Sequence, residues 1–300
     1  MENTNGGVYM QKIIPHLWFD KEAVEAAELY TSIFENSNIE SIIQIHDTPS
    51  GTSDNVELKL SGQEFIFISA GPTFQHSPAI SLMVHCSSKE EVNRLWELLS
   101  IEGTVLMEVG KYPNSEWYGW VNDRYGVSWQ IVLTDKPITQ KIVPHIMYSG
   151  KQARKAKEAV EFYTTLFENS TVEAILYDKE NSDMPNRVQY AAFTIEGHLF
   201  SAMDSVMDHD FTFNEAFSIL VNCENQKEID FLWDKLSMVP EAEQCGWLKD
   251  RFGVSWQISP RILGEMLATK DEKQKERVVQ SFLQMKKMDI AELERAYNYE

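Results

Sequence analysis

The sequence is poor in cysteine, in positive charge and in long apolar runs. Its three cysteines, Cys86, Cys223 and Cys245, form no Cys-x-x-Cys pair, so neither a disulfide framework nor a thiolate metal site is indicated. Cys86 and Cys223 each end an apolar stretch, which is typical of buried structural thiols. With 27 Lys and Arg against 46 Asp and Glu, the chain has a formal charge of −19. This charge argues against binding to nucleic acid or to an anionic membrane surface.

Signals for several other classes of protein are missing as well. No run is apolar and long enough to cross a bilayer, and the first residues lack the apolar core of a signal peptide. There is no Gly-x-Gly turn of the kind that holds a nucleotide-type methyl donor, and spacing reveals no Ser-His-Asp or Cys-His arrangement. We therefore expect a cytoplasmic protein. Its 300 residues, 43% of them hydrophobic, are enough for two globular domains.

The clearest positive feature is a repeated stretch. GWVNDRYGVSWQI at 119–131 returns 127 residues later as GWLKDRFGVSWQI at 246–258, identical at ten of thirteen positions. In each copy Asp-Arg-aromatic-Gly predicts a tight turn, because Asp can bond its own backbone and Gly can take a positive φ. The Val-Ser-Trp-Gln-Ile that follows alternates as a strand does. We therefore expect Trp129 and its copy Trp256 to face helices in a core, and Gln130 to face a wetter cleft.

Both halves of the chain also repeat outside this stretch. Each half contains two modules in which a strand is followed by a helix and three more strands. The first strands of the four modules are 12–20, 80–86, 141–149 and 217–223. The pattern predicts an α+β fold of two tandem domains, 10–135 and 140–263, that pair within the chain. Each domain is expected to form a curved mixed sheet of eight strands, with two helices on its convex face and a flexible lead-in at 1–9.

The halves differ in one segment, and a tail follows them. Between the second helix and the Gly-Trp strand the first half has eighteen residues, 101–118, and the second half has eight, 238–245. The two clefts therefore cannot be identical. Residues 264–300 predict amphipathic helices that are too polar to form a core of their own. We expect these helices to lie across a domain, or to join two chains in a homodimer.

Together these features resemble the vicinal oxygen chelate superfamily, the group of glyoxalase I, extradiol dioxygenases and bleomycin-resistance proteins. The histidine-bearing first strands and the string DRYGVSWQI are similar to its PhnB-like branch, often labelled demethylubiquinone methyltransferase. The resemblance covers residues 10–263 and implies paired modules curved around a cleft, with metal ligands on first and last strands. Carried over to this sequence, those positions are His16, Ser81 and Gln130 in the first half, and His145, Ser218 and Gln257 in the second.

This set of side chains is incomplete for a metal site. A divalent metal needs about three protein ligands of imidazole, carboxylate or thiolate type, and each half keeps one imidazole. His85 and Asp204 could substitute, although their counterparts are Asn222 and Ser69. If a divalent metal is bound, the candidate ligands are His16, His85, Gln130, His145, Asp204 and Gln257. No other cofactor is indicated.

We expect the better-formed cleft in the first half. Its predicted boundary is His16, Trp18, Ser81, Met83 and Gln130. The residues predicted to close over a ligand there are Tyr112, Trp117 and Tyr118. The leading hypothesis is a module that binds a small, partly aromatic molecule without a metal. The alternatives are a glyoxalase- or dioxygenase-type enzyme that uses Mn, Fe or Zn, and a chain in which one domain serves structure alone.

Overall fold

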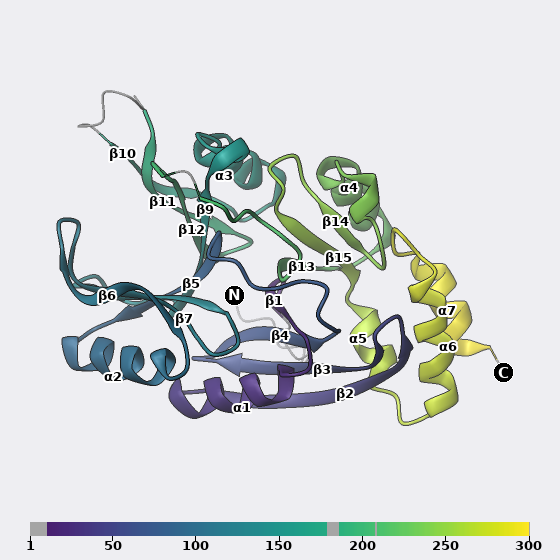
Figure 1. Cartoon of the computed structure of the whole chain (residues 1–300). Coiled ribbons are helices and arrows are strands. Elements are labelled where there is room, and N and C mark those ends of the chain that lie inside the picture. The colour runs from purple at the N-terminus through teal and green to yellow at the C-terminus, as the bar shows by residue number, and fades with distance from the viewer. Residues whose placement is uncertain (1–10, 179–185, 208, 300) are drawn as a thin grey trace, which may run out of the picture.

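Four modules follow one another in the computed structural model, which describes residues 11–178, 186–207 and 209–299 (Figure 1). The lead-in expected at 1–9 lies outside the described residues. The first module contains β1 (Ile13–Phe19), α1 (Ala23–Ile33), β2 (Asn38–Thr48), β3 (Gly51–Leu60) and β4 (Gln63–Ser69). The second contains β5 (Ile80–Cys86), α2 (Lys89–Ser100), β6 (Thr104–Tyr112), β7 (Ser115–Asn122) and β8 (Ser128–Leu133).

The second half of the chain repeats this plan with one loss. The third module contains β9 (Ile142–Tyr148), η1 (Gly150–Gln152), α3 (Ala156–Leu166), β10 (Val172–Tyr177), β11 (Val188–Ile195) and β12 (His198–Asp204). The fourth contains β13 (Phe217–Cys223), α4 (Gln226–Leu236), η2 (Pro240–Ala242), β14 (Trp247–Lys249) and β15 (Ser255–Pro260). The shorter segment 238–245 therefore replaces the counterpart of β6 with a single 3-10 turn, and β14 is much shorter than β7.

The two sheets are built across the repeats. The first and fourth modules form a seven-stranded sheet in the order β14-β15-β13-β1-β4-β3-β2. The second and third modules form an eight-stranded sheet in the order β10-β11-β12-β9-β5-β8-β7-β6. The α+β class and the paired modules with curved mixed sheets are confirmed. The expectation that 10–135 and 140–263 each form a separate eight-stranded sheet is wrong, because the modules that share a sheet come from different repeats.

A core on the helix side of each repeat explains why modules from different repeats share a sheet. The indole of Trp129 on β8 packs on Tyr30 of α1, with ring centroids 5.0 Å apart, and donates to Asp123 Oδ2 at 2.8 Å. Both rings are fully buried, and the hydroxyl of Tyr30 donates to the same carboxylate. The two modules of a repeat are therefore joined through their helix-covered faces. Each first strand then has a free edge that the other repeat can fill.

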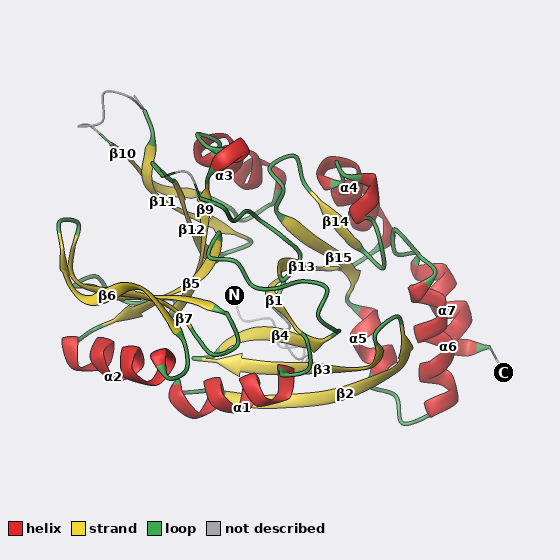
Figure 2. Cartoon of the chain, viewed as in Figure 1, coloured by secondary structure: helices red, strands yellow, loops and turns green. Residues whose placement is uncertain are grey.

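The second repeat has the same core, which confirms the predicted orientation of both tryptophans. Trp256 is fully buried and donates to Asp250 at 2.9 Å, and Tyr163 of α3 donates to the same carboxylate at 2.6 Å. Figure 2 shows α1 and α2 along one side of the molecule and α3 and α4 along the other, with the strands between them.

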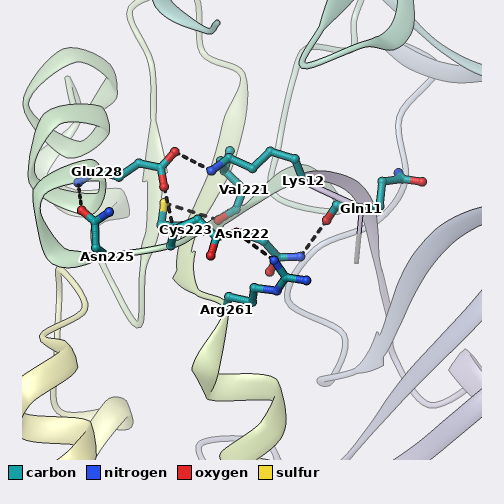
Figure 3. Close-up of polar contacts among 9 residues, drawn as sticks. Gln11, Lys12, Val221, Asn222, Cys223, Asn225, Glu228 and Arg261 are labelled. Atoms are coloured by element: carbon teal, nitrogen blue, oxygen red, sulfur yellow. Dashed lines mark hydrogen bonds and ion pairs between the residues drawn. The ribbon is translucent and has the colours of Figure 1, made fainter. Parts of the chain in front are cut away.

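The seams between the repeats are antiparallel pairs of first strands. β1 pairs with β13, and β5 pairs with β9. At the first seam Lys12 forms an ion pair with Glu228 of α4, and the Asn222 side chain donates to the Gln11 carbonyl at 2.9 Å (Figure 3). At the second seam the equivalent ion pair joins Lys141 to Glu91 of α2. Each ion pair links one repeat to the other.

The C-terminal tail forms three helices that lie across the seven-stranded sheet: α5 (Ile262–Leu267), α6 (Glu272–Leu283) and α7 (Ile290–Asn298). Asp271 and Asp289 cap α6 and α7, and Val278, Val279 and Leu293 are buried. The apolar stripe predicted for the tail is thus used within this chain, while a homodimer through these helices stays a prediction. No helix in the described part of the chain is long and apolar enough to cross a membrane.

Candidate functional site

The histidine, serine and glutamine picked out by the sequence come together at the centre of each sheet, but from different repeats. In the seven-stranded sheet His16 on β1 lies opposite Ser218 on β13, and Gln257 Nε2 donates to Ser218 Oγ at 3.0 Å. In the eight-stranded sheet His145 on β9 lies opposite Ser81 on β5, and Gln130 donates to Ser81 at 2.7 Å. The same three residue types therefore occupy equivalent places twice.

The predicted boundary of the first cleft is corrected by this strand pairing. His16 and Trp18 lie in the seven-stranded sheet, whereas Ser81, Met83 and Gln130 lie in the eight-stranded sheet beside β9. The sequence prediction grouped them because it assumed that both modules of one repeat share a sheet. In the structure, the partners of His16 are supplied by residues more than two hundred positions away.

A cavity of about 830 Å³ lies on the seven-stranded sheet, and we call it the open cleft. Its floor is formed by side chains of the central strands, including Ile14, His16, Ile66, Ile68, Leu220 and Gln257. Its aromatic wall contains Trp18, Phe74 and Trp247, and Trp247 stands edge-on to His16 with ring centroids 5.4 Å apart. This volume is in the range of pockets that hold small molecules.

The C-terminal helices and the shortened fourth module complete the open cleft. Leu263 and Leu267 of α5, together with Phe282 of α6, line the cavity on the side away from the sheet floor. The turn before β14 is tied to the tail, since the N–H groups of Cys245 and Gly246 donate to the carbonyls of Met285 and Lys286 at 2.8 and 2.7 Å. The tail therefore takes the place that the missing strand would have had.

At the equivalent place on the eight-stranded sheet, which we call the closed site, a tyrosine of β7 reaches the central glutamine. Tyr118 on β7 donates to Gln130 Oε1 at 2.9 Å and packs edge-on against Tyr112 at 5.7 Å between ring centroids. His145 Nδ1 is 2.8 Å from Ser201 Oγ. Tyr118 thus contacts Gln130 and Tyr112 packs on Tyr118, both in a different sheet from His16, and their closing over a ligand stays a prediction.

Trp117 is not a cleft residue. Its indole N–H donates to Asn93 Oδ1 of α2 at 2.8 Å, and Lys89 of the same helix lies over its ring at 4.6 Å from the centroid. Alternation along β7 places Trp117 with Gly119 and Val121 on the face that packs on helices, and Gly119 approaches the ring of Trp96 too closely to carry a Cβ. The prediction for Trp117 was wrong because the strand's alternation was not applied to it.

Burial keeps both site histidines neutral. His16 is 4% exposed, and burial lowers its pKa from 6.5 to about 3. His145 is equally buried, and burial lowers its pKa to about 4. Among the described residues, His16 Nδ1 has no hydrogen-bond partner. That nitrogen is itself buried, and the neutral imidazole as a whole lines the open cleft and can accept or donate a hydrogen bond according to its tautomer.

The side chains at the two sites do not fit a divalent metal. Each contributes one imidazole, one hydroxyl and one neutral amide, and the amide already donates to the hydroxyl. Metals of this class need about three ligands with more basic or charged donors. Within the described ranges, no three His, Cys, Asp or Glu side chains are grouped so that they could hold a metal ion.

The two substitute ligands suggested by the sequence lie elsewhere. His85 pairs with Lys141 at the seam, four residues along β5 from Ser81, which is about 13 Å at the rise of a strand. Asp204 is buried and accepts the N–H groups of Ala156 at 3.0 Å and Val188 at 3.1 Å. Its counterpart Ser69 accepts the first N–H of α1 in the same way. Asp204 is thus a residue that orients a helix.

Some residues of the open cleft were missed by the sequence reasoning, although a signal for them exists. Glu57 alternates with the buried Val56 and Leu58, and Glu64 precedes the buried Phe65. Alternation alone places both glutamates on the cleft face, together with Ile66 and Ile68. The role of the tail residues had no such signal, because it depends on how the helices dock.

Comparison with known proteins gives a consistent family assignment. The family model described as 3-demethylubiquinone-9 3-methyltransferase matches residues 11–132 and again 140–259. No curated protein matches the chain. Among solved structures, a putative 3-demethylubiquinone-9 3-methyltransferase, PhnB protein, from Bacillus cereus is 39% identical over 41% of this chain and 100% of its own, with a TM-score of 0.39.

Two further solved structures are similar to this chain. A mutant of glyoxalase I from Zea mays is 10% identical over 84% of this chain and 95% of its own, with a TM-score of 0.49. A glyoxylase/bleomycin resistance protein/dioxygenase domain from Frankia sp. is 14% identical over 44% of this chain and 95% of its own, with a TM-score of 0.33.

Proposed function

The chain belongs to the family described as 3-demethylubiquinone-9 3-methyltransferase, in two tandem copies, and we propose that it binds one small, largely apolar and partly aromatic molecule in the open cleft. The observation that carries this proposal is the cavity of about 830 Å³ lined by His16, Trp18 and Trp247. Apolar pockets with a few convergent polar groups are the usual sites for such ligands. The closed site, with the same central residues, has no comparable role in the proposal.

The chemistry of the cleft favours binding over a metal-dependent reaction. His16 is neutral and desolvated, and Gln257 and Ser218 are bonded to each other. These groups can orient a ligand through hydrogen bonds, whereas aromatic and aliphatic surfaces supply most of the affinity. Methyl transfer is not part of the proposal, since the sequence has no Gly-x-Gly turn for a nucleotide-type donor.

Binding of tryptophol, a neutral indole alcohol, tests this proposal by isothermal titration calorimetry. Its ring suits the aromatic wall, and its N–H or O–H can donate to His16. We expect saturable binding that is weakened roughly tenfold by Trp247→Leu, because a partly buried aromatic contact is worth about 1–2 kcal/mol. Ile66→Trp, which places a large ring on the cleft floor, should abolish binding.

The repeat offers a matched control. Trp120 occupies the position of Trp247 in the other copy, but it lies in the eight-stranded sheet and donates to Ser128 Oγ at 2.8 Å. Trp120→Leu should leave tryptophol binding as it is in the wild type. Absence of saturable binding to the wild-type chain, or equal losses in the two tryptophan variants, would contradict the proposed function.

A further inference from the structure

The open cleft is lined by more carboxylates than cations. Of the described residues that line the cavity, two are cationic, Lys59 and Arg261. The glutamates that line it number five: Glu40, Glu57, Glu64, Glu215 and Glu241. Lys59 neutralises Glu40 at 2.6 Å, and Lys249, which is outside the cavity, neutralises Glu215 at 2.8 Å. Arg261 is paired with Glu224, also outside the cavity, at 2.8 Å.

Two of these carboxylates, Glu57 on β3 and Glu64 on β4, form no ion pair within the described part of the chain. Glu57 accepts a hydrogen bond from Ser41 at 2.9 Å, and Glu64 accepts one from the Gln11 N–H at 3.0 Å. Burial raises the pKa of Glu64, and the negative charges of Glu40 and Glu57 act in the same direction, whereas the Gln11 N–H and the positive charge of Lys59 lower it. A positive charge near these two groups would therefore be stabilised.

Glu57 and Glu64 lie in the same sheet as a buried group that lacks a partner. His16, Ile66 and Glu57 occupy one row across β1, β4 and β3, so Glu57 lies two strand spacings, about 10 Å, from His16. His16 is nine-tenths buried or more, lines the same cavity, and has an unpartnered Nδ1. A ligand that spans this row would meet a neutral hydrogen-bonding group at one end and carboxylates at the other.

The aromatic wall suits a cationic ligand as well. Trp18 stands edge-on to Phe74 at 5.1 Å and to Trp247 at 6.2 Å between ring centroids, and all three rings line the cavity. Ring faces attract cations through their quadrupole, and more strongly where water is excluded. Arene rings of a ligand can also pack against them.

We propose that the open cleft selects aromatic amines, with the ligand's ring beside His16 and Trp247 and its ammonium group beside Glu57 and Glu64. The inference rests on the proposed function and adds the charge of the ligand. The closed site gives an internal contrast, because the register places Ala192 where Glu57 lies, and Leu199 where Glu64 lies. Glu57 and Glu64 are therefore specific to the sheet with the open cleft and have no acidic counterparts at the closed site.

Three indoles that differ in one end group test the inference: tryptamine, tryptophol and indole-3-acetate. Calorimetry at neutral pH should show tryptamine binding about tenfold more tightly than tryptophol, the ratio expected for one charge-assisted hydrogen bond. Indole-3-acetate should bind more weakly than tryptophol. The double variant with Glu57→Gln and Glu64→Gln should reduce the tryptamine-to-tryptophol ratio to about twofold or less.

A control variant separates the cleft from the overall negative charge of the protein. Glu90 and Glu97 are exposed on α2, which covers the other sheet, and Glu90→Gln with Glu97→Gln changes the net charge by the same amount. This variant should keep the tenfold ratio. If it lowers the ratio as much as the cleft variant, or if the cleft variant keeps the ratio, the inference is overturned.

The outcomes also distinguish this inference from the proposed function. Saturable binding of all three indoles with equal affinity would refute the selection of amines and leave the binding site in place. No saturable binding of tryptophol would refute the proposed function itself. If the double variant fails to fold, the single variants Glu57→Gln and Glu64→Gln take its place. Each should lower the tryptamine-to-tryptophol ratio in part. Together with the affinity for indole-3-acetate, they decide whether the cleft selects amines.

Discussion

The two sheets have the same three residue types at their centres and differ in the elements that cover them. Both place an imidazole opposite a serine, with a glutamine bonded to that serine. On the eight-stranded sheet Tyr118 reaches the glutamine. On the seven-stranded sheet Cys245 holds the position of Tyr118, the segment before it is shortened, and helices of the tail border a cavity.

The difference between the two sites therefore comes from the elements that surround each sheet. The imidazole, serine and glutamine at the centres of the two sites are the same, so these three residues cannot by themselves decide which site is open. The absence of a β6 counterpart and the docking of α5 and α6 provide the space.

The largest effect is expected where the two halves are alike. Trp129→Ala and Trp256→Ala should each lower the free energy of unfolding by about 3–5 kcal/mol, since each removes a fully buried indole. The loss should be similar in both, because each indole packs on a tyrosine of a helix and bonds a buried aspartate. Urea unfolding measures it. A loss below about 1 kcal/mol in either variant would mean that the indole is not in the core.

The buried histidines should make both sites sensitive to acid. Burial lowers their pKa values from 6.5 to about 3 and about 4, so the unfolded chain binds more protons as the pH falls below 6.5. Stability from this source is complete above that pH and is lost towards the folded values. His16→Gln or His145→Gln should each reduce the pH slope of the unfolding free energy by up to about 1.4 kcal/mol per pH unit.

The slopes are compared between variants because other buried groups titrate in the opposite sense. Burial raises the pKa values of Asp123 and Asp250, which stabilises the folded chain as the pH falls. These groups are common to all the variants and cancel in the differences. His46→Gln, on an exposed part of β2, is the control. An unchanged slope in His16→Gln would show that the imidazole is solvated.

A smaller effect should distinguish the two glutamines. Gln257→Glu places a carboxylate near His16 in the open cleft, so the affinity for Ni²⁺ should rise roughly tenfold, about 1.4 kcal/mol. The gain should disappear when His16→Gln is added. Gln130→Glu should gain less, because Tyr118 and Ser201 occupy the groups around it. Tight binding of a divalent metal to the wild-type chain, measured by calorimetry, would contradict this account.

Much of the fold follows from local patterns in the sequence. The repeated turn and the alternation around Trp129 predict four modules and the direction of that indole, because both depend on residues close together in the chain. Which strand pairs with β1 does not follow from local patterns. β5 and β13 have the same apolar alternation, and only the packing of α1 on Trp129 leaves the edge of β1 to β13.

The candidate site could be predicted in part for the same reason. The family resemblance placed His16 and Gln257 at the cleft, but their meeting depends on the exchange of modules between repeats. Glu57 could have been assigned to that face from its buried neighbours. The space above them could not, since it is set by α5 and α6, whose apolar stripes do not specify where they dock.

The most direct test of the central claim is a crystal structure of the chain grown with tryptophol. We expect one molecule of tryptophol per chain in the open cleft, bordered by His16, Trp247 and α5. The hydrogen bond from Tyr118 to Gln130 on the other sheet should be intact. A molecule bound beside His145 with Tyr118 displaced, or tryptophol in both sheets, would contradict the central claim.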